Sequence, residues 1–153
     1  MTRVARQLLE PIPAHRTAGI EVVRAADGAA EIAATTPEGL TNVIGSLHSS
    51  GLVALLDAAG LGAIIADNPE PDMAGILPLG WAATLEFLAP ARGRLVATCR
   101  LAAQEREALA MLWSGEQERV RLSTSAEVTD AGGRLVCRGT FHWSVQRIPV
   151  PAI

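Results

Sequence analysis

The sequence predicts an α+β fold in which an antiparallel β-sheet is wrapped around one long central helix. Three features indicate this class: a pair of short apolar runs near the start, one long apolar run after them, and four further strand-like segments joined mostly by short turns. Runs of strands with a single dominant helix are typical of α+β folds. At 153 residues the chain fits a single domain, residues 1–153, that can bury a substantial core.

The first predicted element is a β-hairpin. Two apolar-rich segments, 19–26 and 29–36, flank Asp27-Gly28, a dipeptide suited to a tight two-residue turn. The proline-rich stretches "EPIPAH", before the hairpin, and "PVPAI", at the end of the chain, lie outside every predicted element. We therefore expect both to be loose terminal segments.

A long helix is predicted at residues 49–66. This apolar run is too long for a typical strand, and the three glycines within it weaken a helix without forbidding it. Because its apolar residues point in all directions around the helix axis, we expect the helix to be enclosed rather than amphipathic. Asn68-Pro69 ends it.

Four more strands and a second, shorter helix complete the predicted order. Apolar side chains recur at every second position of segment 79–88, which predicts a strand with Leu79, Trp81, Ala83, Leu85 and Phe87 on one face. The same period predicts three later strands, the last two joined by the turn "DAGG". The predicted ranges are 79–88, 94–101, 120–130 and 135–145 for the strands and 105–114 for the helix.

Composition and charge narrow the classes of function. The chain is 49% hydrophobic and 19% charged, as in globular proteins, and its net charge of -3 gives no basic field for nucleic acid. The first residues lack the apolar run of a signal peptide, and the longest apolar run is interrupted by Asp57. We therefore expect a cytoplasmic protein with no nucleic-acid or membrane partner. Cys99 and Cys137 lie in strand-like segments without metal-ligand spacing, so we expect buried, reduced thiols and no metal.

Asp57 is the single charged residue inside the long apolar run. Burying an ionised carboxylate without partners costs at least several kcal/mol, so specific donors must hold it or it must lie near a cleft. The residues alone leave a structural and a functional role open. His48 lies nine residues earlier, which in a helix means roughly 13 Å along the axis and the opposite face. A site that uses both residues would therefore need a second copy of the chain, in a twofold dimer with two composite sites.

A family resemblance appears around these residues. Asn42, Gly45 and His48 form an N-x-x-G-x-x-H motif that leads into the helix, and Asp57 follows nine residues after His48. With the element order and the segments "FLAPARGRLVA" and "AEVTDAGGRLVCRGT", this motif resembles the hotdog-fold acyl-CoA thioesterases of the phenylacetate-pathway, PaaI-like branch. The resemblance covers residues 19–145. The chain departs from the family pattern in having serines where two glycines usually follow the histidine, and in the helical insert 105–114.

The resemblance implies hydrolysis of an acyl-CoA or aryl-acyl-CoA thioester in a homodimer or homotetramer, with coenzyme A as part of the substrate and no cofactor. Asn42, His48 and the backbone N–H of Ser49 would come from one subunit and Asp57 from the other. The free N–H at the helix start would hold the thioester oxygen, and Asp57 would act as general base or nucleophile. Asn42 would orient water or thioester, although a turn role is equally open, and His48 would position the carbonyl or the loop.

Two other functions remain as alternatives. One is a non-catalytic acyl-thioester binder, in which the serines after His48 prevent the backbone geometry that an oxyanion site needs. The other is a hotdog hydratase or dehydratase, which is disfavoured because Gly62 stands where a histidine would be expected shortly after Asp57. A serine hydrolase is not expected, since neither Ser49 nor Ser50 lies in a G-x-S-x-G motif.

Overall fold

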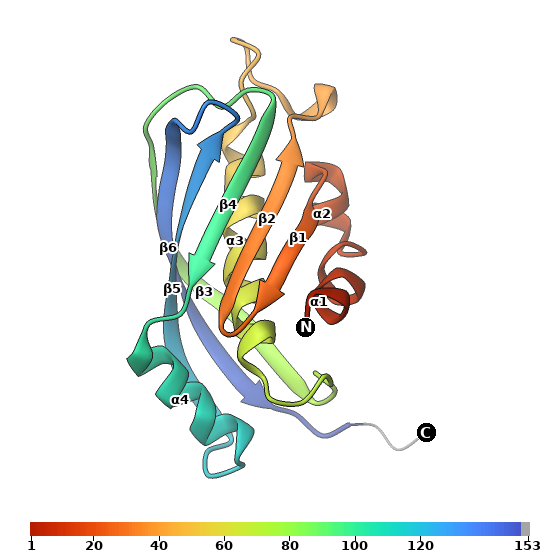
Figure 1. Ribbon diagram of the computed structural model, residues 1–153, viewed down its shortest axis with the longest axis vertical. Coiled ribbons are helices and arrows are strands. Elements are labelled where there is room, and N and C mark those ends of the chain that lie inside the picture. Colours follow the sequence, from red (N-terminus) through yellow and green to blue (C-terminus); the bar gives the residue numbers. More distant parts are fainter. Residues whose placement is uncertain (151–153) are drawn as a thin grey trace.

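The computed structural model describes residues 1–150, in which a six-stranded antiparallel sheet curves around one long helix (Figure 1). The strand order is β1-β2-β4-β5-β6-β3, so β1 and β3 are the two edges. The elements are α1 (Thr2–Leu9), α2 (Pro13–Ala18), β1 (Glu21–Ala26), β2 (Ala29–Thr35), the 3-10 helix η1 (Glu38–Leu40), α3 (Ser49–Asp67), β3 (Ile76–Phe87), β4 (Arg94–Arg100), α4 (Ala103–Trp113), β5 (Arg119–Asp130) and β6 (Leu135–Arg147).

The six predicted strands and the two predicted helices are confirmed, with boundaries that differ by a few residues. The hairpin turn between β1 and β2 shows the reason most clearly. Asp27 and Gly28 both have positive φ, 52° and 68°, which is the backbone that an Asp-Gly turn supplies and that keeps two antiparallel strands in register. Of the predicted loose C-terminal stretch, Pro149 and Val150 form no regular element, and residues 151–153 lie outside the described part of the chain.

The prediction that "EPIPAH" is a loose terminal segment was wrong, because residues 10–12 form the turn between α1 and α2 and residues 13–15 belong to α2. Pro13, which suggested irregular structure, occupies the first turn of α2, where a backbone N–H has no helical acceptor and proline is well tolerated. Gly19 ends α2 with a φ of 69°. Both helices pack against α3, and Ala5 and Leu9 of α1 belong to the hydrophobic core.

Helix α1 also seals the β1 edge of the sheet. Thr2 and Arg6 of α1, and Glu10 just after it, follow at four-residue spacing and face the outer backbone groups of β1. Thr2 Oγ1 donates to the Ala25 carbonyl at 3.2 Å and accepts the Ala25 N–H at 3.0 Å. Arg6 Nε donates to the Val22 carbonyl at 2.9 Å, and Glu10 Oε1 accepts the Val22 N–H at 3.0 Å. An edge whose backbone groups are satisfied in this way is closed to another strand.

At the other edge, the prediction that five alternate apolar side chains of β3 share one face was wrong. The pairing with β6 shifts between Gly80 and Ala82, and this β-bulge reverses the alternation. Trp81 therefore lies on the outer face of the sheet, with its ring 5.4 Å from that of His142 and with Arg121 above it. Leu79 shares the outer face, whereas Ala83, Leu85 and Phe87 face inward.

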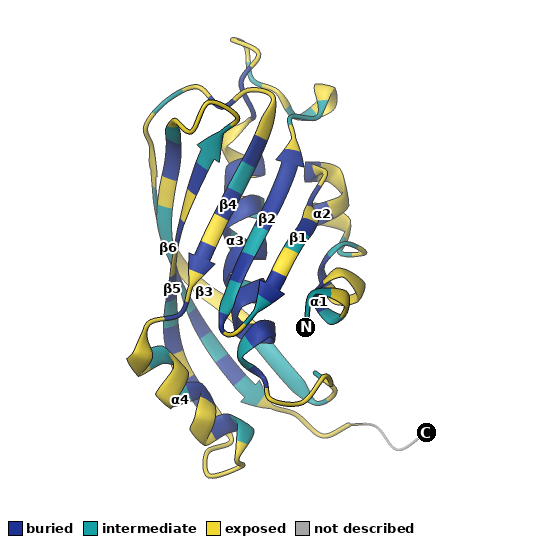
Figure 2. Ribbon diagram, viewed as in Figure 1, coloured by how far each residue is buried: buried dark blue, intermediate teal, exposed yellow. Residues whose placement is uncertain are grey.

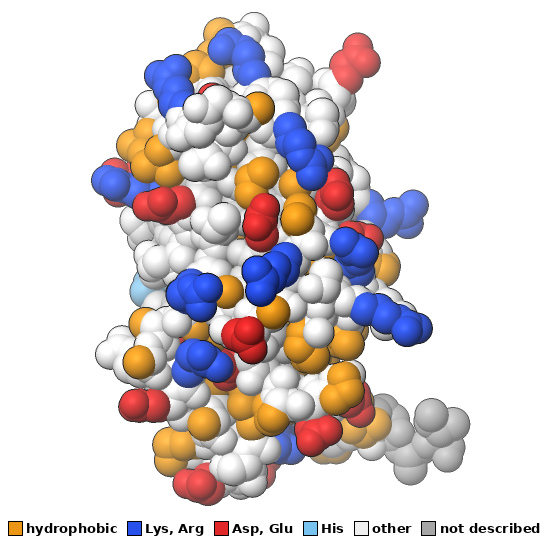
Figure 3. All heavy atoms as spheres, viewed as in Figure 1, with side chains coloured by type: hydrophobic (Ala, Val, Ile, Leu, Met, Phe, Trp, Pro, Cys, Tyr) orange, Lys and Arg blue, Asp and Glu red, His pale blue; other side chains and the backbone are white. Residues whose placement is uncertain are grey.

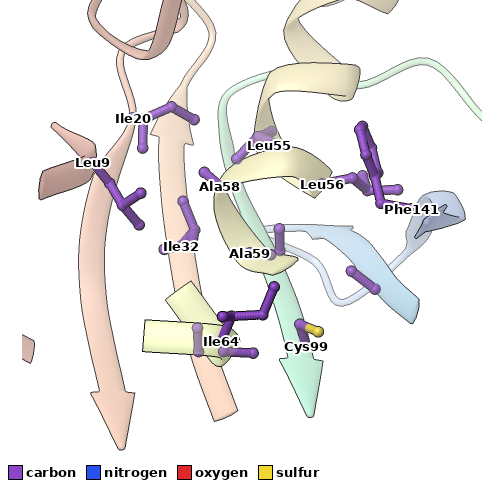
Figure 4. Packing of buried hydrophobic residues seen from close by; sticks show 14 of the residues in the cluster. Leu9, Ile20, Ile32, Leu55, Leu56, Ala58, Ala59, Ile64, Cys99 and Phe141 are labelled. Carbon is purple, nitrogen blue, oxygen red and sulfur yellow. The ribbon is translucent and has the colours of Figure 1, made fainter. Parts of the chain in front are cut away.

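The inner face of the sheet packs on α3 to form the core (Figure 4). Buried and exposed positions alternate along strands such as β4, whereas most of α3 is buried (Figure 2). By length and mean hydropathy of 1.7, α3 could span a bilayer, but 67% of that segment is buried inside the fold, as in a core helix. Both cysteines are free and buried, as predicted, and burial raises the pKa of Cys99 to about 12 and that of Cys137 to about 11.

The outer face of the sheet carries arginines and acidic residues beside one another (Figure 3). Two ion pairs join strands there, each with a nitrogen-oxygen distance of 3.2 Å: Arg94 of β4 with Glu21 of β1, across β2, and Arg138 of β6 with Glu86 of the adjacent β3. All four side chains are about half exposed, so these pairs add little to stability.

Candidate active site

The loop before α3 is organised by Asn42. Its Oδ1 accepts hydrogen bonds from the backbone N–H groups of Ile44 and Ser46, both at 3.1 Å, and its carbonyl accepts the N–H of Gly45. Gly45 has a φ of 73°, which explains the glycine of the motif. The turn role considered for Asn42 is therefore present, while its Nδ2 has no hydrogen-bond partner among residues 1–150.

His48 is the N-cap of α3. Its Nδ1 accepts the backbone N–H of Ser50 at 3.1 Å and lies 2.8 Å from the Ser50 hydroxyl. A capping nitrogen must offer a lone pair, so the neutral imidazole carries its proton on Nε2. The ring is exposed, which leaves this Nε2–H available as a donor to a ligand at the start of the helix.

Ser49 is the first residue of α3, and its backbone N–H has no hydrogen-bond partner in the described chain. Unpaired N–H groups at a helix start carry partial positive charge and can hold an anionic oxygen. Ser49 and Ser50 are both helical and neither has a positive φ. Serine is therefore accommodated at both positions without backbone strain.

A hollow of about 330 Å³ lies beside this helix start. It is open to solvent and is lined on one side by the motif loop and on the other by the end of β3. Ser46 fixes the two walls relative to each other, since its Oγ accepts the Ala91 N–H at 2.8 Å. The lining side chains include Asn42, Ile44, Ser49, Leu52, Phe87 and Leu88.

Asp57 lies on the one stripe of α3 that the chain does not bury. From Ser50 to Ala66, all residues are buried except five that recur at helical spacing: Ser50, Val53, Ala54, Asp57 and Leu61. The Asp57 side chain is 31% exposed. The carboxylate therefore faces outward among small and apolar side chains, a surface that a single chain leaves uncovered.

The partner of Asp57 is His15 of α2, a residue that the sequence did not single out. His15 Nε2 lies 2.8 Å from Asp57 Oδ2, and its Nδ1 lies 2.9 Å from the Leu9 carbonyl oxygen. Only 2% of His15 is exposed. One signal was available in the sequence: a carboxylate in an apolar helix needs a hydrogen-bond donor. That signal does not say which of the three histidines is the donor.

The structure thus brings Asn42, His48 and Ser49 together at the start of α3 and places Asp57 elsewhere. Within the described chain, His48 and Asp57 form neither a hydrogen bond nor an ion pair with each other, and each has its own local partner. The nine-residue separation along a regular helix accounts for this. No group of three or more His, Cys, Asp or Glu residues within 1–150 is arranged to hold a metal.

The six-stranded antiparallel sheet around one long helix is the hotdog fold, as solved structures show. A Pseudomonas aeruginosa protein described as a probable thioesterase is 24% identical, with a TM-score of 0.78 and 97% of both chains covered. A candidate thioesterase from Shewanella oneidensis is 13% identical, with a TM-score of 0.76 and 96% of both chains covered. A mutant of a thioesterase enzyme from Staphylococcus aureus is 16% identical, with a TM-score of 0.65 over 86% of this chain and 96% of that one.

The chain belongs to the family described as "Domain of unknown function (DUF4442)", which matches residues 2–145. No curated protein matches its sequence. At the identities above, the structural likeness establishes the fold, and the predicted hotdog fold is confirmed.

Proposed function

We propose that this protein is a thioesterase that hydrolyses an acyl-CoA or aryl-acyl-CoA thioester, as in the PaaI-like branch. The observation that carries the proposal is Asp57: one acidic side chain on the uncovered stripe of α3, with Oδ2 held by His15 and no partner for Oδ1 within residues 1–150. A carboxylate held at one oxygen and open at the other is suited to act on a water molecule or on a carbonyl carbon. Structural neighbours described as thioesterases support the same class.

The reaction follows from the groups at the start of α3. The thioester carbonyl oxygen binds the free Ser49 N–H, with His48 Nε2–H as a second donor, and both donors stabilise the negative charge that develops when the carbonyl is attacked. Asp57 takes a proton from the attacking water, or attacks the carbonyl itself to form an acyl anhydride that water then opens. In both routes the carbon-sulfur bond breaks, and the thiolate of coenzyme A leaves and is protonated.

The site is complete only with a second copy of the chain. The β3 edge has no pairing partner among the described residues, in contrast to the sealed β1 edge. Ala83, Leu85 and Phe87 on the inner face of β3 are not buried, and α3, which contacts β3, exposes its own stripe. A second chain that pairs along β3 covers both surfaces and brings its own His48 loop toward Asp57.

A charge placed on the α3 stripe is expected to separate the two copies. Val53→Arg puts two cations into an apolar contact around a twofold axis, which should raise the dimer Kd at least about 10²-fold and lower activity with it. The matched control is Met111→Arg in α4, because Met111 and Val53 are both 38% exposed and Met111 lies outside the proposed interface. Light scattering on both variants measures the change, and it also separates a dimer from a tetramer. A wild-type protein that is monomeric and fully active would contradict the composite site.

The function is tested by thiol release from a panel of aliphatic and aromatic acyl-CoA thioesters, with carrier-protein thioesters alongside. We expect turnover of at least one member, and the preferred acyl group defines the substrate class. Tight binding of acyl-CoA by calorimetry without turnover would instead identify the non-catalytic binder. The unstrained helical backbone of Ser49 and Ser50 favours the enzyme over that alternative.

A further inference from the structure

His15 is held in a fixed orientation by the short helix α2. Its own carbonyl accepts the Ile20 N–H at 3.0 Å, just after the left-handed Gly19 that ends the helix. Its ring lies between α1 and α3, with one nitrogen on a backbone carbonyl and the other on the Asp57 carboxylate. A buried ring bound at both nitrogens has no freedom to turn.

The hydrogen bonds set how many protons His15 and Asp57 hold together. The Leu9 carbonyl can only accept, so Nδ1 of His15 must carry a proton. The second contact, from Nε2 to Oδ2 at 2.8 Å, needs one further proton between the two atoms. This shared proton holds Oδ2 of Asp57 and leaves Oδ1 without a partner in the described chain, on a side chain that is 31% exposed on the uncovered stripe of the helix.

Nearby charged side chains have other partners or none. On α1 and at its end, Arg6 and Glu10 bind the backbone of β1. Asp67, at the far end of α3, pairs with Arg106 of α4. Among residues 1–150, His15 is the one side chain in hydrogen-bond contact with Asp57.

We infer that His15 is a positioning residue for Asp57, so that the α1–α2 segment is a functional part of the catalytic unit as well as the cover of the β1 edge. The inference rests on the proposed thioesterase function. His15 touches no substrate in this arrangement. It acts by holding one carboxylate oxygen, so that the other meets the water or the carbonyl at a fixed angle.

Two substitutions of similar size separate the hydrogen bond from the packing. His15→Met fills the space without a donor, whereas His15→Gln keeps an N–H that can reach Asp57. We expect the methionine variant to lose about 10²-fold in kcat with KM changed less than about threefold, because an error of orientation acts on the chemical step. The glutamine variant should stay within about tenfold of wild type. Arg16→Gln, an exposed change on the same helix, should leave both constants unchanged.

The outcomes separate the two proposals. A folded, dimeric His15→Met variant with wild-type kcat, beside an inactive Asp57→Asn variant, would overturn the role of His15 and leave the thioesterase intact. A wild-type protein that cleaves no thioester would overturn both. If the methionine variant does not fold, His15→Asn takes its place, because its amide is one methylene shorter than that of glutamine and cannot reach Oδ2. Equal kcat values for the asparagine and glutamine variants would then overturn the inference.

Discussion

Asp57→Asn is expected to lower kcat for thioester hydrolysis by about 10²–10⁴-fold, the range that loss of a catalytic acid or base covers. Asparagine has the size of aspartate but cannot accept a proton from water or form an anhydride. Its Nδ2 can donate to His15, whose Nε2 then accepts, so the buried contact at 2.8 Å survives in neutral form. The fold and the dimer should therefore be retained, and the loss should fall on kcat.

The matched control for this substitution is Asp67→Asn on the same helix. The Asp67 side chain is only 5% exposed and binds Arg106 Nε at 2.6 Å and Trp113 Nε1 at 3.1 Å, so it anchors α4. We expect this variant to lose stability and to keep its kcat. Steady-state thiol release and thermal unfolding of both variants measure the two effects. Equal rates for wild type and Asp57→Asn on a good substrate would remove Asp57 from the chemistry.

Gly139→Val is expected to lower the free energy of unfolding by about 3 kcal/mol, the upper end of the usual cost of overpacking. A Cβ at Gly139 of β6 would lie 2.7 Å from Leu56 Cδ2 and 2.7 Å from the Thr84 backbone oxygen. The leucine could rotate, but the backbone oxygen belongs to the paired strand β3 and cannot move without breaking the sheet. Glycine is therefore required at this contact between α3 and the sheet.

Gly39→Val is the control, because nothing lies within 4 Å of its Cβ position and its φ is not positive. It should change stability by no more than about 0.5 kcal/mol. Urea unfolding at one fixed protein concentration compares the two variants, since the stability of a dimer depends on concentration. A Gly139→Val protein as stable as wild type would mean that helix and sheet can separate at this point without cost.

The elements that could be predicted are those whose signal is local. The apolar run of α3 and the Asp27-Gly28 turn carry their structure in adjacent residues, and both are confirmed. Helix α1 is amphipathic, but its eight residues are too few to be stable alone, so the helix depends on contacts to β1 that no local pattern reveals. The bulge at Gly80 was equally hidden, since alternation in the sequence gives no sign of an inserted residue.

The candidate site divides in the same way. The loop from Asn42 to His48 lies within one short segment, so its motif predicted the start of the helix and the free N–H of Ser49, although the His48 side chain as the cap was not predicted. The contact between His15 and Asp57 joins residues 42 positions apart, through a helix that was not predicted. Spacing did show that His48 and Asp57 could not meet in one chain, because a helix fixes that distance whatever surrounds it.

The unequal edges of the sheet have a consequence for how the protein behaves at high concentration. A sheet with two open edges can add strands at both ends and so grow without limit into fibres. Here the β1 edge is blocked by Thr2, Arg6 and Glu10. Two chains that pair through β3 therefore leave only blocked β1 edges, to which a third chain cannot add a strand. Growth by strand addition then stops at a pair, and the short amphipathic helix at the start of the chain serves as protection against polymerisation.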